Sequence, residues 1–120
     1  MRLWLSRGCI AFVFFANVQC AVAFIVSPGA FAPSYELSGA VGMATIQAIG
    51  VLFLMWNVPY AVALWHPVRH RLSLWEAIIM QAIGVSGESL LLISLPGGHE
   101  VLQSSIERFI LFDGMGLVLF

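Results

Sequence analysis

Long apolar runs alternate with short polar segments along the whole chain. The runs cover residues 8–26, 39–65, 74–95 and 106–120. A helix that crosses a membrane needs about 20 predominantly apolar residues, and the first three runs have roughly that length. The pattern predicts an all-α fold, an integral membrane four-helix bundle in which residues 1–120 form a single transmembrane domain.

The fourth run differs from the others in length. It ends at Phe120 after about 15 residues, short of the ~20 that a crossing needs, and no polar flank follows it. We therefore expect a fourth helix that is truncated, with more apolar residues and a polar end after Phe120 in the complete reading frame.

The first run has two interpretations. A basic start, an apolar stretch and Ala21-Val22-Ala23 or Ala30-Phe31-Ala32 imitate a cleaved signal peptide. The run is longer than the ~7–15 residues of a signal core, which favours a retained membrane helix. A cleaved signal remains the alternative.

The second run contains a proline. Its 27 residues exceed what a perpendicular crossing needs, so we expect the helix to tilt or to kink at Pro59. Proline removes a backbone donor and clashes with the carbonyl four residues earlier, that of Met55. The amide of Asn57 is close enough to satisfy the freed group, and Asn57 and Pro59 are therefore interpreted as a structural kink.

Residues 66–71 form a basic turn between the second and third runs. Arg69 and Arg71 lie there without a nearby acid, which predicts contact with lipid headgroups and a cytoplasmic location. Arg2 and Arg7 indicate that the N-terminus is also cytoplasmic, and two crossings between the sites agree with this orientation.

His66 and His70 have the spacing of two metal ligands on a helix. Pro67 interrupts that helix, however, and no third ligand is near in the sequence. We expect attraction to anionic lipid rather than a metal site, and no motif indicates a cofactor.

Composition narrows the class of protein further. The chain is 61% hydrophobic and 9% charged, compared with the roughly 25% charged residues of a soluble domain. Five Lys and Arg against six Asp and Glu leave a net charge of −1, so no basic surface is available for nucleic acid. Membrane lipid is the partner that this composition predicts.

The second and third runs carry similar stripes of small and polar residues. Gln81, Gly84 and Glu88 share one helix face, and Gln47 and Gly50 recur at the same spacing in the second run. Such stripes mediate close helix packing in membranes, so we expect these two faces to pack together.

A pentapeptide is repeated within these stripes. Gln47-Ala48-Ile49-Gly50-Val51 recurs unchanged as Gln81-Ala82-Ile83-Gly84-Val85. An internal duplication is one explanation. Chance in an apolar chain of low diversity is favoured, because the flanking residues do not continue the match.

Ionisable residues within the apolar runs form the candidate site. By the helix rise, Glu88, Asp113 and Gln47 lie at similar depth, with Gln81 on the Glu88 face and Arg108 about one turn from Asp113. A charge in hydrocarbon costs several kcal/mol unless it is paired, protonated or hydrated, and therefore marks a functional site. A structural Glu88–Arg108 pair, or a carboxyl hydrogen-bonded to Gln47, is the alternative.

The layout of the chain resembles a known group. The loop that ends in Glu36-Leu37-Ser38-Gly39, with an arginine before the first helix and an arginine-bearing turn before the third, resembles the DoxX-like small membrane proteins of bacteria. The resemblance implies a four-helix bundle in the bacterial inner membrane, attached to a redox or quinone-linked complex. It implies no catalytic residue.

Two functions follow from these observations. The favoured one is an accessory or scaffold subunit of a membrane complex, whose partners are other membrane subunits or copies of itself. The alternative is binding or proton-coupled transport of a small amphipathic, quinone-like molecule through Glu88 and Asp113. An enzyme with a covalent mechanism ranks third, because no serine or cysteine has a histidine predicted at its depth.

Overall fold

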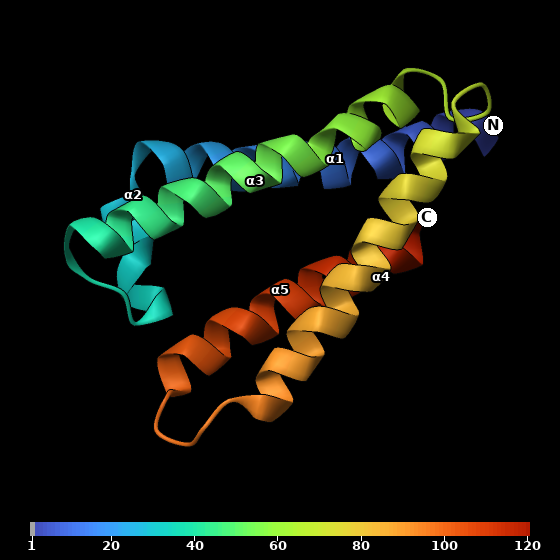
Figure 1. Ribbon diagram of the computed structural model, residues 1–120. Coiled ribbons are helices and arrows are strands. Elements are labelled where there is room, and N and C mark those ends of the chain that lie inside the picture. The colour runs from blue at the N-terminus through green and yellow to red at the C-terminus, as the bar shows by residue number, and fades with distance from the viewer. Residues whose placement is uncertain (1) are drawn as a thin grey trace.

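The computed structural model describes residues 2–120 and is helical throughout. Its elements are α1 (Arg2–Val26), α2 (Pro28–Phe31), the 3-10 helix η1 (Ala32–Tyr35), α3 (Gly39–Trp65), α4 (Arg71–Ser94) and α5 (Glu100–Leu119). Figure 1 shows two antiparallel helix pairs, α1 with α3 and α4 with α5. The pairs meet at the end that holds the α3–α4 turn and diverge toward the opposite end.

Within residues 2–120, three helices are long and apolar enough to cross a membrane. They are Leu3–Val26, Gly39–Trp65 and Arg71–Ser94. Large apolar side chains such as Leu5, Phe15 and Ile93 are exposed on their outer surfaces. Such surfaces are unfavourable in water and are typical of helices in contact with lipid.

The last two long helices begin earlier than the hydrophobic pattern predicts. The first turn of α4 is closed by the bond from Leu74 N–H to His70 O at 3.2 Å, and that of α5 by the bond from Gln103 N–H to His99 O at 2.9 Å. Because α5 begins at Glu100 instead of residue 106, it has 20 residues and a length of about 30 Å. The hydrophobic pattern does not detect a first helical turn that is made of polar residues.

The α1–α3 pair is held together by a close backbone approach. A Cβ atom on Gly50 would lie 2.8 Å from the carbonyl oxygen of Ala21. Beside it, Gln47 donates from Nε2 to the carbonyl of Ile25 at 3.1 Å. The expectation that this face of α3 packs on α4 is therefore wrong, because Gly50 lets α1 approach instead.

The α4–α5 pair has a reciprocal contact of the same kind. The carboxylate of Asp113 on α5 lies against Gly84 on α4, and the amide of Gln81 on α4 lies against Gly116 on α5. In both helices the polar residue and the glycine are three positions apart, so they share a face. The two copies of the repeated pentapeptide thus contact different helices.

Pro59 lies inside α3, which continues unbroken from Gly39 to Trp65. The amide of Asn57 donates to the carbonyl of Phe53 at 2.6 Å. It does not reach the carbonyl of Met55, which the sequence analysis expected it to satisfy. An asparagine amide that bonds the carbonyl four residues earlier is satisfied by its own preceding turn.

The two helix pairs are tied together at both ends. At the end where they meet, the Tyr60 hydroxyl on α3 donates to the carbonyl of Ala77 on α4 at 3.2 Å. At the divergent end, the Ser105 hydroxyl on α5 donates to the carbonyl of Ser34 in η1 at 2.5 Å. These ties leave the middle of the molecule open between the pairs.

Candidate functional site: a cavity between the helix pairs

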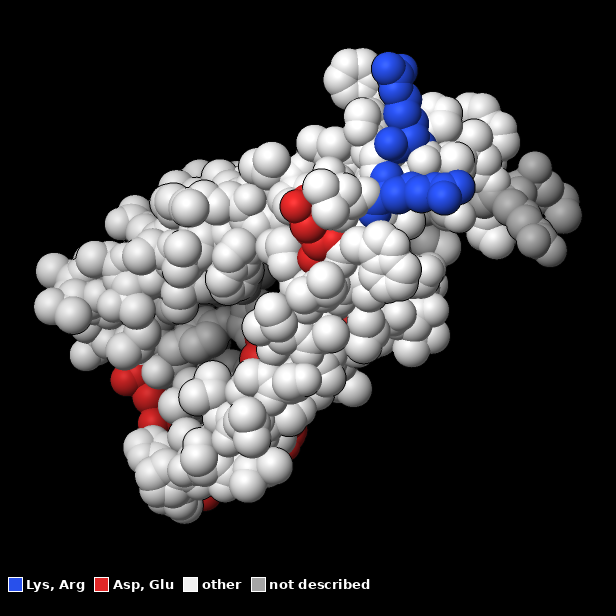
Figure 2. Space-filling view, turned by 45° about the vertical axis from the view of Figure 1, so that its right-hand side comes forward, with Lys and Arg blue, Asp and Glu red and all other residues white. Residues whose placement is uncertain are grey.

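A cavity of about 630 Å³ lies between the α1–α3 pair and the α4–α5 pair. Figure 2 shows the molecule hollowed between its two halves. The volume falls within the range of roughly 300–1,000 Å³ that small-molecule sites occupy. All four long helices and η1 contribute side chains, and those that bear polar groups include Asn17, Ser34, Tyr35, Asn57, Tyr60, Gln81, Glu88, Ser105, Arg108 and Asp113.

One wall of the cavity is aromatic. Phe24 and Phe53 stack with ring centroids 5.9 Å apart, and Phe53 meets Phe109 edge to face at 5.7 Å. Tyr35 lies 6.3 Å from Phe109 and extends the cluster into η1. These rings come from α1, η1, α3 and α5, so only the folded molecule brings them together. They offer an apolar surface for the body of a ligand.

Three buried polar atoms among the cavity-lining residues have no partner within the described structure: Asn57 Oδ1, Gln81 Nε2 and Glu88 Oε2. Asn57 and Gln81 are each only 3% exposed. A buried polar group without a partner costs about 1–3 kcal/mol, and native proteins contain few of them. Three such atoms around one cavity therefore point to a bound group.

Glu88 and Asp113 line the cavity without an arginine partner. Arg108 donates from Nε to the carbonyl of Ser104 at 3.2 Å and from Nη2 to the hydroxyl of Ser105 at 3.2 Å. Among the described residues it forms no ion pair with Glu88, so the structural pair considered in the sequence analysis is absent there. Arg108 instead contacts the first half of its own helix.

Four of the five residues of the predicted site line the cavity. These are Glu88, Asp113, Gln81 and Arg108. The fifth, Gln47, is exposed on α3 and does not line it. A carboxyl hydrogen-bonded to Gln47 is therefore also absent from the described structure, since the Gln47 amide bonds α1.

Asn57, interpreted from the sequence as part of a structural kink in preference to a ligand role, also lines the cavity. A usable signal exists in the spacing. Phe53, Asn57 and Tyr60 lie at i, i+4 and i+7 and thus share one face of α3, an aromatic face with one amide. That face, rather than the face of Gln47, lines the cavity.

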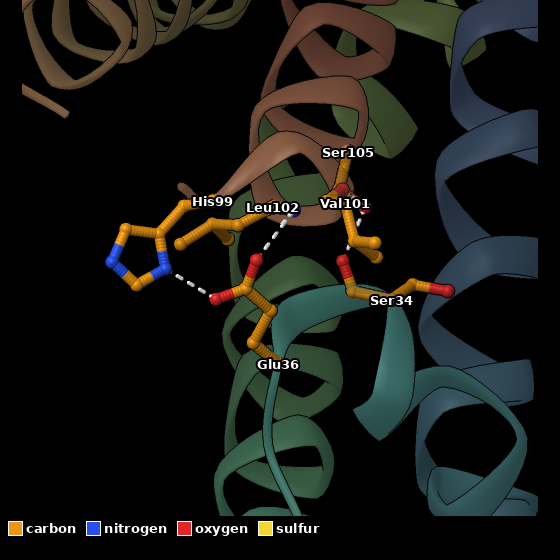
Figure 3. A network of polar contacts seen from close by, with 6 residues as sticks. All are labelled: Ser34, Glu36, His99, Val101, Leu102 and Ser105. Atoms are coloured by element: carbon orange, nitrogen blue, oxygen red, sulfur yellow. Dashed lines mark hydrogen bonds and ion pairs between the residues drawn. The ribbon is translucent and has the colours of Figure 1, made fainter. Parts of the chain in front are cut away.

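A second polar cluster closes the divergent end of the molecule (Figure 3). One oxygen of Glu36 pairs with His99 Nδ1, and the other accepts a hydrogen bond from the backbone N–H of Leu102 at 3.4 Å. Glu36 thus reaches from the η1 end to the N-terminus of α5, where a carboxylate is favoured by the helix dipole. We name the Glu36–His99–Leu102 contacts the latch.

The latch involves an unusual backbone conformation at Glu36 and a change in the pKa of its carboxyl. Glu36 has a φ of +55°, a left-handed conformation that costs a non-glycine residue about 1–2 kcal/mol. The hydrogen bond from His99 lowers the pKa of the Glu36 carboxyl, and the Leu102 N–H adds to this effect. Both groups favour the ionised carboxylate, which joins the two helix pairs.

The basic turn carries His66, Arg69, His70 and Arg71. Within residues 2–120, no group of three or more His, Cys, Asp and Glu side chains is arranged to hold a metal ion. His66 uses its Nδ1 to accept the backbone N–H of Arg69 at 3.2 Å. Arg69 and Arg71 are exposed at this turn and are available to groups outside the molecule.

Comparison with protein-family models, curated proteins and solved structures gives no match. The resemblance to DoxX-like proteins therefore stays a prediction, and function has to be argued from the cavity itself.

Proposed function

We propose that this protein binds a small amphipathic molecule in the cavity between its two helix pairs. The observation that supports the proposal most is the set of three unpartnered polar atoms, Asn57 Oδ1, Gln81 Nε2 and Glu88 Oε2, around one cavity in the described structure. A ligand with a polar head would bond polar side chains of the cavity lining, and its apolar body would contact the aromatic wall.

We further propose that the molecule is a multi-pass protein of the cell membrane, a four-helix bundle of the bacterial inner membrane with a cytoplasmic N-terminus. The exposed apolar surfaces of the long helices support a lipid environment. In Figure 2 the arginine side chains visible on that face gather at one end of the molecule, whereas acidic side chains extend to the opposite end. That asymmetry is consistent with the positive-inside rule.

Water alone is a weaker occupant than an amphipathic ligand. Waters in proteins need two to four polar partners each, and most of this cavity is bounded by aromatic and aliphatic side chains. An apolar body against Phe24, Phe53 and Phe109 gains about 25 cal/mol for each Å² of apolar surface removed from water. The combination of apolar walls with a few polar groups is typical of ligand sites.

The experiment is identification of small molecules retained by the protein. The protein is purified in mild detergent, and native mass spectrometry compares the wild type with Ala16→Phe, which puts a ring into the cavity wall. Ala61→Phe, on the exposed surface of α3 outside the cavity, is the control. We expect a bound species on the wild type and on Ala61→Phe, and its loss from Ala16→Phe.

The accessory-subunit hypothesis gives a different result in the same experiment. It predicts a partner protein that co-purifies with the wild type and with both variants, and no retained small molecule. That result would also favour attachment to a redox or quinone-linked complex, which the resemblance to DoxX-like proteins implies.

A further inference from the structure

Resting on the proposed function, we infer that the ligand is an organic amine dissolved in the membrane, bound as its ammonium form by Glu88 and Asp113.

Two of the three buried polar atoms without a partner among the cavity-lining residues are acceptors, Asn57 Oδ1 and Glu88 Oε2. The oxygen Asn57 Oδ1 accepts only, and its orientation is set because the Nδ2 atom of the same amide donates to Phe53 O at 2.6 Å. The carboxylates of Glu88 and Asp113 add further acceptor atoms, and Gln81 Nε2 is the donor among the three buried atoms. A ligand that brings N–H donors satisfies this set, whereas one that brings acceptors leaves most of it unpaired.

The charge balance favours the same ligand. Two carboxylates line the cavity, and the guanidinium of Arg108 is engaged with Ser104 O and Ser105 Oγ. Arg108 keeps its charge when it bonds these neutral oxygens, so an ammonium group supplies the second positive charge that two carboxylates need, and a buried charge is tolerated when it is paired and hydrogen-bonded. Phe109 and Phe112, close in sequence to Asp113, also line the cavity, and the face of an aromatic ring attracts a cation.

The cavity has an opening toward the surface between α3 and α4. Two of its lining residues there are strongly exposed, Trp56 on α3 at 50% and Ile83 on α4 at 65%. One turn along α4 from Ile83, Gly87 also lines the cavity, and a Cβ atom on it would meet no atom of the described structure within 4 Å. In the proposed orientation this opening faces the hydrocarbon, so the ligand arrives from lipid. We name Trp56, Ile83 and Gly87 the lateral opening.

The test uses three probes with the same tail and different heads: decylamine, decanol and decanoate. The full chain is reconstituted in nanodiscs, and the affinity for each probe is measured by calorimetry. We expect decylamine to bind about 10–100-fold more tightly than decanol, the ratio for hydrogen bonds to a charged group, and decanoate to bind weakest.

Two variants test the role of the carboxylate. Glu88→Gln keeps the size of the side chain and removes its charge, and we expect it to reduce decylamine affinity about tenfold or more without changing decanol affinity. Glu76→Gln on the same helix, exposed and outside the cavity, is the matched control and should bind like the wild type.

Each result separates the inference from the proposed function. Equal binding of decylamine and decanol, or tighter binding of decanoate, overturns the amine assignment and retains an amphipath site. A loss of decylamine binding in Glu76→Gln as large as in Glu88→Gln also overturns it. If none of the probes binds, and Ala16→Phe retains whatever the wild type retains, the proposed function itself fails.

Discussion

The carboxylate of Asp113 on α5 occupies the space beside Gly84 on α4 that a Cβ atom would need. Glycine at residue 84 therefore positions an acid of the cavity as well as allowing two helices to approach. The neighbouring contact has the same form with the helices exchanged, because Gln81 on α4 lies against Gly116 on α5. Close helix packing and the polar lining of the cavity thus depend on the same residues.

Gly84→Ala is predicted to alter the site more than the fold. The added methyl group must displace the end of the Asp113 side chain, so we expect decylamine affinity to fall about tenfold while the stability changes little. Gly50→Ala is the contrasting variant, because its methyl group meets the backbone oxygen of Ala21 at 2.8 Å. It should destabilise the protein by about 1–3 kcal/mol in unfolding experiments in detergent. Equal effects of both variants on stability would contradict this distinction.

The latch predicts a loss of stability in acid. Because the pKa of Glu36 is lower in the folded protein than its ordinary value of 4.5, the ionised carboxylate stabilises the folded state. This contribution is present above about pH 4.5 and is lost as pH falls through the lower folded value. Thermal unfolding measured from neutral to acid pH should show the loss in the wild type.

Glu36→Gln should remove that component of the pH dependence, since the amide does not titrate. Glu100→Gln is the control, as Glu100 is exposed in the first turn of α5 and, within residues 2–120, forms no bond between the helix pairs. An identical acid profile for wild type and Glu36→Gln would show that the latch does not stabilise the fold.

Gly87→Leu is predicted to obstruct the lateral opening. Neither Gly87 nor Gly114 has a neighbour in the described structure within 4 Å of an added Cβ atom, and only Gly87 lines the cavity. Both substitutions to leucine should raise helix propensity by up to about 1 kcal/mol. We expect Gly87→Leu to slow decylamine association in nanodiscs, measured by stopped-flow fluorescence, and Gly114→Leu to leave the rate unchanged. A slower rate in both variants would argue against entry at Gly87.

Tyr60→Phe should loosen the end at which the helix pairs meet. It removes the buried hydrogen bond to the carbonyl of Ala77, which contributes about 0.5–1.5 kcal/mol. Tyr35→Phe is matched in chemistry, and within residues 2–120 the Tyr35 hydroxyl forms no hydrogen bond. Hydrogen exchange of the amides in the first turns of α4 should be faster in Tyr60→Phe and unchanged in Tyr35→Phe.

Reporter fusions test the orientation. A reporter placed in the turn at Arg69 should be cytoplasmic, and reporters at Gly29 and Gly97 should be external, because the arginine-bearing turn favours the cytoplasmic side. Accessibility of a single cysteine introduced at each of the three positions gives an independent measurement. An external Arg69 would reverse the orientation and move the latch to the cytoplasmic side.

The sequence by itself was sufficient to predict the helical class and the approximate extent of the long helices. Hydropathy is a local property, so the membrane-length runs follow from composition within each segment. It was also sufficient to select Glu88 and Asp113 as candidate site residues. An ionisable side chain in an apolar run is unusual whichever helix the run packs against. Hydropathy detects only apolar turns, so the polar first turns before Leu74 and Ile106 were not predicted.

The tertiary structure alone decided which polar residues meet. Gln47 and Gln81 begin identical pentapeptides, yet Gln81 is buried in the cavity wall and Gln47 is exposed beside α1. No local property separates them, because the difference arises from the helix that packs against each copy. Asn57 was treated as a partner of Pro59 and instead lines the cavity together with Gln81 and Glu88. The cavity exists only because the two helix pairs diverge. Burial of a side chain is set by contacts between segments far apart in the chain, and these contacts depend on packing that the local pattern does not encode.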